Sequence, residues 1–368
     1  MTFDVAIVGG GPVGLVTALE LHARGLRVVV FERRGGDVDK ACGEGLMPQG
    51  TAALRRLGAM QYLTPADCAP FTAIRYIQED GRGVQAPLPA PGGLGVRRTA
   101  LRSALLRAAR DQGIDVRDDC AVRSHDIGAS DVLLATDAGT VRARFLVAAD
   151  GLHSPIRRSL GLERERASGE PQRFGVRRHV AMAPWAPCVE VHWNAGVEAY
   201  VTPTGNNRVG LGFLWERDAL TGAVDFDALL ARFPALERRF AGAPADSRAM
   251  GAGPLLQRVV ARTARRAALV GDAAGFVDGI TGEGLSVGFA QARALAAVLP
   301  DALREGATVA SLARYERASA RVFRHAAVTA HGLLWLARRP RLRRFVFDRC
   351  IEAPVLFRLA LRAAVAGD

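Results

Sequence analysis

The first thirty-two residues alternate apolar runs with a glycine-rich turn in the order typical of a β-α-β unit. A short apolar run, Val5 to Val8, predicts a buried strand, and glycines follow it at once. Apolar residues at helical spacing then predict a helix over about 13–23, which Gly25 ends. A second apolar run predicts a strand over 26–31. We therefore expect strand, helix and strand in direct succession.

The turn after the first strand has the spacing G-x-G-x-x-G, formed by Gly9, Gly11 and Gly14 together with Pro12. The first glycine permits a tight turn, the second lets the backbone approach a pyrophosphate, and the third lets the helix pack close to the strand. Glu32 closes the second strand, 23 residues after Gly9, where a carboxylate can accept hydrogen bonds from a ribose diol. This order predicts a dinucleotide site at a helix N-terminus. A glycine-rich turn in an ordinary α/β unit would not explain the acid.

Strand and helix patterns recur at both ends of the chain, with a strand-rich middle between them. A helix is predicted from Arg98 to Ala109, and strands follow around 115–122, 131–136 and 140–148. Residues 174–215 predict an antiparallel meander with turns at 194–196 and 205–207. From residue 266 the pattern returns to strand, turn and helix, and the remainder is helical and basic. We predict a nucleotide domain (1–72, 97–165 and 262–300), an inserted substrate domain (73–96 and 166–261) and a C-terminal helical region (301–368).

The last strand of the predicted meander carries Gly210 and Gly212 on one face, because side chains alternate along a strand. Glycines on one face leave room above a sheet for a ligand, although crowding against a neighbouring helix explains them equally well. Tyr200 and Thr202 share one face of the preceding strand. They are candidates for lining the same cavity, with a role as plain sheet residues as the alternative.

Composition places the chain among folded, non-membrane proteins. With 49% hydrophobic and 23% charged residues in 368, the chain can bury a large core. It contains no run of roughly 18 or more apolar residues, and a strand begins almost at the N-terminus, so we expect neither a signal peptide nor a membrane span. We expect a cytoplasmic protein. Its five scattered cysteines lack any C-x-x-C spacing, which argues against disulfides and against a metal site.

The net charge of +12 suggests nucleic acid or an anionic membrane as a partner. Lys40 is the only lysine, however, so arginine supplies nearly all the positive charge, as in proteins of GC-rich genomes, and we interpret this charge as mostly spread along the chain. We therefore expect no nucleic-acid partner. The exception is 338–344, with five arginines beside an apolar stretch. A solvated helix face is the ordinary interpretation; peripheral membrane contact through the basic C-terminal helices is the alternative.

Four segments in this order resemble the FAD-dependent oxidoreductases with the para-hydroxybenzoate hydroxylase fold. They are GGGPVG with Glu32, Arg98-x-x-Leu101-x-x-x-Leu105, Asp150-Gly151-x-x-Ser154-x-x-Arg157, and GDAAGFVDGITGEG over 271–284. The resemblance implies an α/β protein with a Rossmann-like FAD-binding domain, an inserted antiparallel-sheet substrate domain and C-terminal helices. DKACGEGLMP (39–48) and the fourth segment are similar to the branch related to geranylgeranyl reductases, which includes both monooxygenase-like and reductase-like proteins.

The resemblance also implies roles for individual residues in holding FAD. The pyrophosphate would lie against Gly9, Gly11, Pro12 and Gly14, and the adenosine ribose would bind Glu32, with Arg33 beside it. Arg98 would reach the phosphate or ribityl region, and its guanidinium suits that task; a solvated helix arginine is the alternative. Val122 would contact the adenine, and Asp272 would contact the ribityl chain. Gly282 and Gly284 would lie against the isoalloxazine. For Asp272 a helix cap is the alternative.

The loop from Cys42 to Gly45 would lie near the reactive ring. There the Cys42 thiol could border the substrate or donate a proton, and Glu44 could orient it. A small buried cysteine in a tight glycine turn is the alternative interpretation.

Our leading hypothesis is an FAD-dependent monooxygenase that uses NAD(P)H and O2 to hydroxylate or epoxidise a hydrophobic, aromatic or polyketide-like molecule. Such chemistry needs the cofactor and a dry pocket more than protein acids or bases. The alternative is a reductase that saturates isoprenoid double bonds, which CGEGLMP and TGEG favour, although the Y-x-W-x-F-P segment we associate with those reductases is replaced by Tyr200-Val-Thr-Pro203. A halogenase ranks third because W-x-W-x-I-P is missing, and a non-catalytic flavin-binding protein ranks last.

Overall fold

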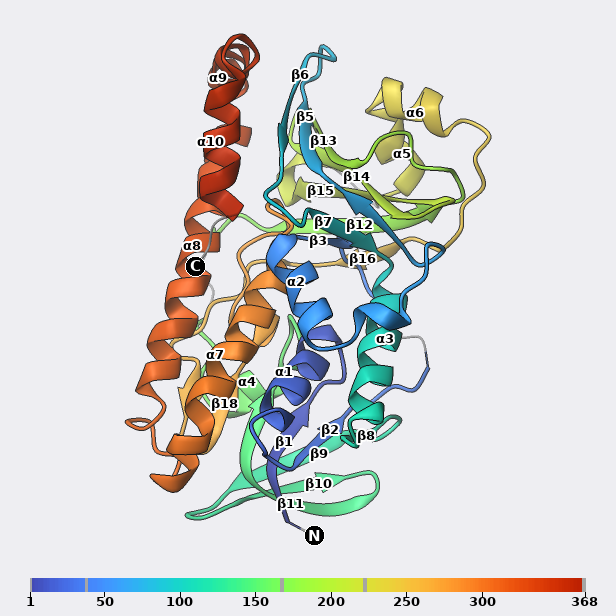
Figure 1. Ribbon diagram of the computed structural model, residues 1–368. Helices are drawn as coiled ribbons and strands as arrows, with labels where there is room; N and C mark the ends of the chain where they lie inside the picture. The colour runs from blue at the N-terminus through green and yellow to red at the C-terminus, as the bar shows by residue number, and fades with distance from the viewer. Residues whose placement is uncertain (1, 37–38, 166–168, 221–223, 366–368) are drawn as a thin grey trace.

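The computed structural model describes residues 2–36, 39–165, 169–220 and 224–365. The remaining residues of the predicted substrate domain (166–168 and 221–223) and of the C-terminal region (366–368) lie outside the described ranges. Figure 1 shows a lower body that contains the N-terminus, an upper body built around a second sheet, and long C-terminal helices along one side of both.

The lower body is built on a parallel sheet whose central strands are completely buried. Its five-stranded parallel core has the order β8-β2-β1-β11-β18. Val5, Ala6 and Ile7 of β1 have no exposed surface, because helices cover one face and a strand layer the other. Antiparallel strands extend this sheet at β11 and β18. The strands are β1 (Thr2–Val8), β2 (Val28–Phe31), β8 (Asp115–Arg117), β9 (Val122–Ile127), β10 (Val132–Thr136), β11 (Gly139–Ala148), β17 (Thr263–Ala264) and β18 (Ala267–Leu269).

Helices from distant parts of the sequence pack together on one face of this sheet. The apolar cluster beneath them contains Leu15 and Leu19 of α1, Leu105 of α3 and Leu295 of α7, all fully buried. The helices and short 3-10 turns of the lower body are α1 (Pro12–His22), α2 (Pro48–Arg56), η1 (Met60–Tyr62), α3 (Arg98–Asp111), α4 (Pro155–Ser159), η3 (Gly271–Ala274) and α7 (Gly284–Arg304). The predicted α/β fold class with a Rossmann-like unit is confirmed, because the first and last thirds of the chain meet in one parallel sheet.

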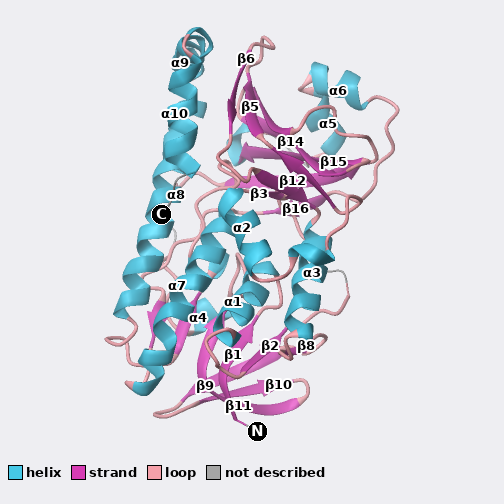
Figure 2. Cartoon of the chain, in the orientation of Figure 1, coloured by secondary structure: helices cyan, strands magenta, loops and turns pink. Residues whose placement is uncertain are grey.

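The upper sheet has seven strands in the order β16-β12-β15-β14-β13-β5-β6, with a three-stranded sheet, β3-β7-β4, below it (Figure 2). The short helices α5 (Phe226–Ala231) and α6 (Pro234–Phe240) cover one of its faces through an aromatic cluster that includes Phe213 and Phe226. The strands are β3 (Gly45–Leu46), β4 (Cys68–Phe71), β5 (Ala73–Ile77), β6 (Gly83–Pro87), β7 (Gly93–Val96), β12 (Arg173–Val180), β13 (Cys188–Asn194), β14 (Val197–Gly205), β15 (Arg208–Glu216) and β16 (Met250–Ala252); η2 (Arg217–Ala219) follows β15.

The predicted meander is right for β13, β14 and β15 but wrong for β12. β12 pairs with β15 instead of β13, and β13 pairs in parallel with β5. The two turn signals at 194–196 and 205–207 mark the two real hairpins. The connection from β12 to β13, residues 181–187, carries no such signal, and its length lets β12 cross to the far side of β15.

Three helices complete the chain: α8 (Ala313–Ala337), α9 (Pro340–Glu352) and α10 (Pro354–Val365). α8 packs along α7, and α9 and α10 pack against β6 (Figure 1). An apolar cluster joins them to the upper sheet, where the ring of Tyr76 lies 6.1 Å from that of Trp193 and 5.9 Å from that of Phe347. Among the described residues, no helix is both long and apolar enough to cross a bilayer.

Arg157 ties the turn η3 to the segment that follows β11. It has no exposed surface, and its guanidinium donates hydrogen bonds to the carbonyl oxygens of Leu152 (3.0 Å) and Ala273 (3.3 Å) and to the side chains of Glu163 and Gln257 (both 3.0 Å). The Ser154 hydroxyl accepts from the Arg157 amide and caps α4. The motif from Asp150 to Arg157 is therefore a structural clamp.

We predict that Arg157→Met lowers the free energy of unfolding by about 3 kcal/mol, because it leaves buried acceptors without a donor. Arg158→Met is the matched control, since Arg158 is exposed, and it should change stability by less than about 0.5 kcal/mol. Urea denaturation of both variants measures the difference. Equal losses would show that Arg157 is not the clamp.

Candidate active site

The glycine turn after β1 brings strand and helix into backbone contact. At Gly9 (φ +112°) a Cβ atom would lie 2.3 Å from the carbonyl oxygen of Ala149, and at Gly14 it would lie 1.8 Å from that of Gly9. At Gly11 the nearest atom to such a Cβ is Nη2 of Arg98, 3.5 Å away, so this side of the turn is open. α1 begins at Pro12 without a side-chain cap, which leaves its first amides for a ligand.

Glu32 and Arg102 hold the glycine turn in place. The Glu32 carboxylate accepts from the Gly10 amide (2.9 Å), and Arg33 beside it is exposed. Arg102 is buried and donates from Nε to the carbonyl oxygen of Gly10 (3.0 Å). Sequence reasoning missed Arg102, although it lies one helical turn after Arg98 and so on the same side of α3. Val122, at the start of β9, packs against the apolar cluster that contains Phe31 and Leu134, and its contact with adenine stays a prediction.

Asp272 lies in η3, surrounded by positive charge. Burial raises the pKa of its carboxyl, while the charges of Arg98, Lys40 and Arg157 act in the opposite direction. The three segments that carry Asp272, Arg98 and Lys40 therefore converge at one place, as the resemblance implies. The ribityl contact of Asp272 stays a prediction.

The loop before α7 borders open space at one glycine only. A Cβ atom on Gly282 (φ +67°) would meet nothing within 4 Å, whereas one on Gly284 would lie 3.2 Å from the ring of Phe276. Gly282 thus leaves room for a ligand, and Gly284 is explained by close packing. Between them Glu283 precedes α7, and its Oε2 is buried without a hydrogen-bond partner among the described residues. Burial raises the pKa of Glu283 to about 7. Sequence reasoning missed Glu283, although its place inside TGEG was a signal.

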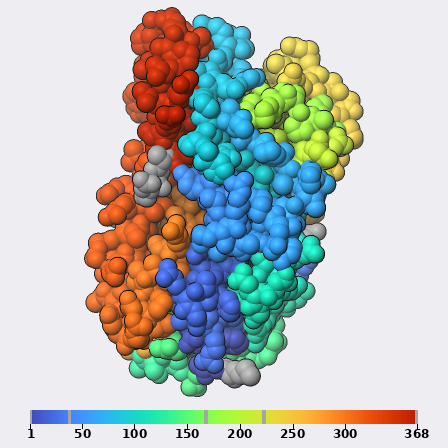
Figure 3. Space-filling view, viewed as in Figure 1, coloured from blue at the N-terminus to red at the C-terminus, as the bar shows by residue number. Residues whose placement is uncertain are grey.

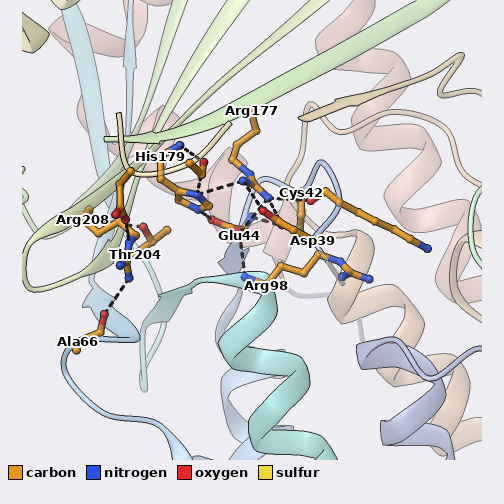
Figure 4. A network of polar contacts seen from close by, with 12 residues as sticks. Asp39, Cys42, Glu44, Ala66, Arg98, Arg177, His179, Thr204 and Arg208 are labelled. Carbon is orange, nitrogen blue, oxygen red and sulfur yellow. Dashed lines mark hydrogen bonds and ion pairs between the residues drawn. The ribbon is translucent and has the colours of Figure 1, made fainter. Parts of the chain in front are cut away.

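A buried polar network joins the 39–44 loop to the upper sheet (Figure 4). Its centre is Glu44, which is 2% exposed and has a positive φ of 58°. Oε1 accepts from the Arg98 backbone amide (2.9 Å) and lies 3.4 Å from Nη2 of Arg177. Oε2 lies 2.5 Å from Nε2 of His179, which has no exposed surface. One carboxylate therefore contacts α3 and two side chains of β12.

The rest of the network fixes His179 and Arg177. Nδ1 of His179 lies 3.0 Å from the Ser247 hydroxyl and 3.1 Å from Nη1 of Arg177. Nη2 of Arg177 donates to Oδ1 of Asp39 (2.6 Å). Burial tends to raise the pKa of Asp39, but its hydrogen bond to Arg177 and the neighbouring positive charges together outweigh that effect, so the pKa lies below its ordinary value. The sequence analysis identified none of Asp39, Arg177, His179 and Ser247 as a site residue.

The Cys42 thiol contacts the backbone of Glu44. Its Sγ lies 3.4 Å from the Glu44 amide nitrogen, and burial raises the pKa of the thiol, which keeps it protonated and neutral. The Glu44 carboxylate is directed at α3 and β12 instead, so the expectation that Glu44 orients Cys42 applies to its backbone only.

The four residues predicted to line a cavity lie under this network or beside the loop before α7. A Cβ on Gly210 would lie 3.6 Å from Oε2 of Glu44, and one on Gly212 would lie 4.0 Å from Cβ of Arg177, so residues of the network lie at van der Waals distance from both glycines. Thr202 is buried next to the three-stranded sheet. The Tyr200 hydroxyl donates to the carbonyl oxygen of Ile280 (3.2 Å). Of the four, Tyr200 is the one that reaches the 271–284 loop; contact with substrate stays a prediction.

The open side of the glycine turn at Gly11, with Arg98 and Glu32 beside the turn, fits the pyrophosphate and ribose of a dinucleotide. Residues 2–330 match a family described as an FAD binding domain. The chain belongs to this family of FAD-binding proteins. Menaquinone reductase from Mycolicibacterium smegmatis is 29% identical over 324 residues, covering 80% of this chain and 76% of that protein. Ubiquinone hydroxylase UbiL from Rhodospirillum rubrum is 31% identical, covering 85% and 76%.

The flavin-dependent brominase Bmp2 has the same fold. It superposes with a TM-score of 0.86 over 99% of this chain and 94% of that protein, at 19% identity. The protein is thus an FAD-dependent oxidoreductase whose relatives carry out both oxygenation and reduction.

We predict that Glu32→Ala and Asp272→Ala each weaken FAD binding by about ten- to a hundredfold, because each removes charge-assisted hydrogen bonds to the cofactor. The exposed Glu305→Ala is the control. FAD titration of the apoproteins, followed by flavin fluorescence, measures the effect. Unchanged affinity in both site variants would place the cofactor elsewhere.

We predict an energetic coupling of about 1–3 kcal/mol between Glu44 and His179, because substitution of either residue leaves the other buried without its partner. A double-mutant cycle with Glu44→Gln and His179→Gln, read by urea unfolding, measures it. The exposed pair Asp301 and Arg304 serves as the control and should couple by about 0.5 kcal/mol or less. Additive effects at Glu44 and His179 would contradict the contact.

Proposed function

We propose that the protein is an FAD-dependent monooxygenase that uses NAD(P)H and O2 to hydroxylate or epoxidise a hydrophobic, aromatic or polyketide-like small molecule. The observation that carries this proposal is the apolar cluster beside the loop before α7, where Val277 and Ile280 pack with Tyr200, Leu214 and Val191 of the upper sheet. Apolar side chains next to this loop suit contact with a hydrophobic substrate, and oxygen chemistry benefits from the exclusion of water.

The polar groups around Arg98, Glu44 and Cys42 would hold the cofactor and the 39–44 loop in place without taking part in the chemistry. FAD, held by these groups, would supply the redox chemistry of a reaction in which NAD(P)H provides two electrons and one oxygen atom of O2 enters the substrate while the other leaves as water. Arg98 and the glycine turn orient the cofactor. The carboxylate of Glu44 is engaged by α3 and β12, and the neutral Cys42 thiol is a weak nucleophile. The similarity to ubiquinone hydroxylase UbiL supports the oxygenase assignment.

A second candidate, a reductase that saturates isoprenoid double bonds, is favoured by Glu283. Saturation of a C=C bond requires a hydride and a proton, and a carboxyl whose pKa is raised to about 7 holds a proton near neutral pH. The buried Oε2 of Glu283 lies in the loop that also carries Ile280. The similarity to menaquinone reductase supports this alternative.

Anaerobic and aerobic turnover separate the two functions. The yellow protein is reduced with NADPH or NADH without oxygen and is then offered either ¹⁸O₂ with a panel of phenols and quinones, or a prenylquinone without oxygen. We predict products that carry one ¹⁸O atom, with one NAD(P)H consumed for each. Reoxidation by the prenylquinone alone, with two hydrogens added to a C=C bond of its prenyl chain, would establish the reductase instead; two hydrogens on the quinone oxygens with the chain unchanged would support neither function.

The variant Glu283→Gln also distinguishes the monooxygenase from the reductase. It should leave hydroxylation within about threefold, because oxygenation needs no proton from this carboxyl, but should abolish saturation. Failure of every acceptor in both assays would refute both functions.

A further inference from the structure

The exposed apolar side chains of the molecule gather on the last three helices. Nine large apolar side chains are strongly exposed among the described residues, and six of them belong to α8, α9 and α10: Val328, Trp335, Phe345, Val355, Leu356 and Leu359, with 48–67% of their surface exposed. We call the exposed faces of these helices the C-terminal surface. Contiguous exposed apolar groups mark a site of interaction.

The positive charge of the chain gathers on the same helices. Residues 313–365 contain twelve arginines and three acidic residues, an excess of nine charges out of a net +12 for the whole chain. The expectation that the charge is mostly spread along the chain is therefore wrong. The arginine run at 338–344 is only part of a larger basic region, residues 313–365.

Spacing places the arginines and apolar side chains on the same side of each helix. On α8 the positions 321, 324, 328 and 335 recur at helical spacing and are exposed, whereas Ser319, Ala330 and Leu334 on the opposite side are buried; the exposed Arg339 follows the end of the helix. On α10, Val355, Leu359 and Arg362 form a similar exposed stripe opposite Leu361 and Val365.

Arginine and aromatic side chains also pair within the C-terminal surface. The guanidinium of Arg339 lies 4.2 Å from the ring centre of Trp335, and that of Arg349 lies 5.7 Å from the ring centre of Phe345. Such pairs place an apolar body and a cation at the same depth, as the headgroup region of a bilayer requires. Figure 3 shows these helices, in orange and red, forming one edge of the molecule.

We infer that the C-terminal surface docks the protein on a bilayer that contains anionic lipids. Phosphate headgroups complement the nine excess charges, and the acyl chains below them accept Trp335, Phe345 and Leu359. A nucleic acid would satisfy the arginines but leave the apolar side chains in water. A second copy of the chain would bring two such basic surfaces face to face, which charge repulsion opposes.

The inner sides of the same helices lead to the apolar cluster beside the loop before α7. Leu334 of α8, Phe347 of α9 and Leu361 of α10 belong to the cluster that contains Ile280, and Tyr200 packs against it. A lipophilic molecule that leaves the bilayer at these helices would meet this cluster first. This route, unlike the docking itself, rests on the proposed function.

Vesicle cosedimentation of the full-length holoprotein tests the docking. The probes are phosphatidylcholine vesicles and vesicles of phosphatidylcholine with phosphatidylglycerol at roughly 3:1. We expect binding to the anionic vesicles, at least about tenfold weaker binding to the neutral ones, and loss of binding at about 1 M salt. The absence of binding to the anionic vesicles would overturn the inference.

Two triple variants assign the binding to the C-terminal surface. Arg341→Gln with Arg358→Gln and Arg362→Gln removes exposed charges, and Trp335→Ser with Phe345→Ser and Leu359→Ser removes exposed apolar groups. Each should lower the vesicle partition coefficient at least about tenfold while the FAD content stays unchanged.

Control variants change exposed arginines and exposed apolar residues elsewhere on the surface. They are Arg24→Gln with Arg55→Gln and Arg238→Gln for charge, and Val260→Ser with Val309→Ser for apolar surface. If the controls lose as much vesicle binding as the triple variants, the surface assignment is overturned. A dimer in analytical ultracentrifugation that the apolar triple variant dissociates, or binding to duplex DNA, each without vesicle binding, would identify a different partner. Because no substrate is added, a failed docking test leaves the proposed reaction untouched.

Discussion

The buried carboxylate of Glu44 is the interaction on which the arrangement of the site depends. A charge with almost no exposed surface is strongly unfavourable unless donors surround it. Here the donors come from two places: the first amide of α3, which belongs to the FAD-binding body, and the side chains of β12, which belong to the upper sheet. The two bodies must therefore meet with one orientation at this point, because any other leaves Glu44, Arg177 or His179 unpaired.

This requirement explains features that otherwise look unrelated. Glu44 has the backbone conformation that usually favours glycine, and the contacts of its carboxylate compensate for that strain. Gly210 and Gly212 stand opposite His179 and Arg177 in the strand register, and a Cβ at either position would come within van der Waals distance of the network. Arg98 serves both halves: its amide binds Glu44, and its guanidinium lies beside the glycine turn. The glycine turn and the loop that contacts the upper sheet thus meet at the same residue.

The sequence predicted the parts of the molecule whose constraints are local. The turn at Gly9 and Gly14, the acid at Glu32 and the helix after Gly282 follow from backbone geometry within one β-α-β unit, so their spacing is visible in the chain. The partners of Glu44 are not, because Arg177 and His179 lie more than a hundred residues away on a strand that shows only a two-residue alternation. The predicted meander also paired β12 with the wrong strand, because the alternation of side chains identifies a strand but not its neighbour in the sheet.

The contrast between Glu44 and Glu283 bears on the chemistry. Both carboxylates border the FAD site, yet Glu44 is surrounded by donors while Oε2 of Glu283 has none among the described residues. A buried carboxyl without donors keeps its proton to higher pH, and burial raises the pKa of Glu283 to about 7. The polar side of the site is therefore suited to holding the loop, and any proton that the protein itself delivers comes from the side that faces the apolar cluster. That cluster continues to the inner faces of α8 and α9, so Glu283 stands where a lipophilic molecule would meet the flavin loop.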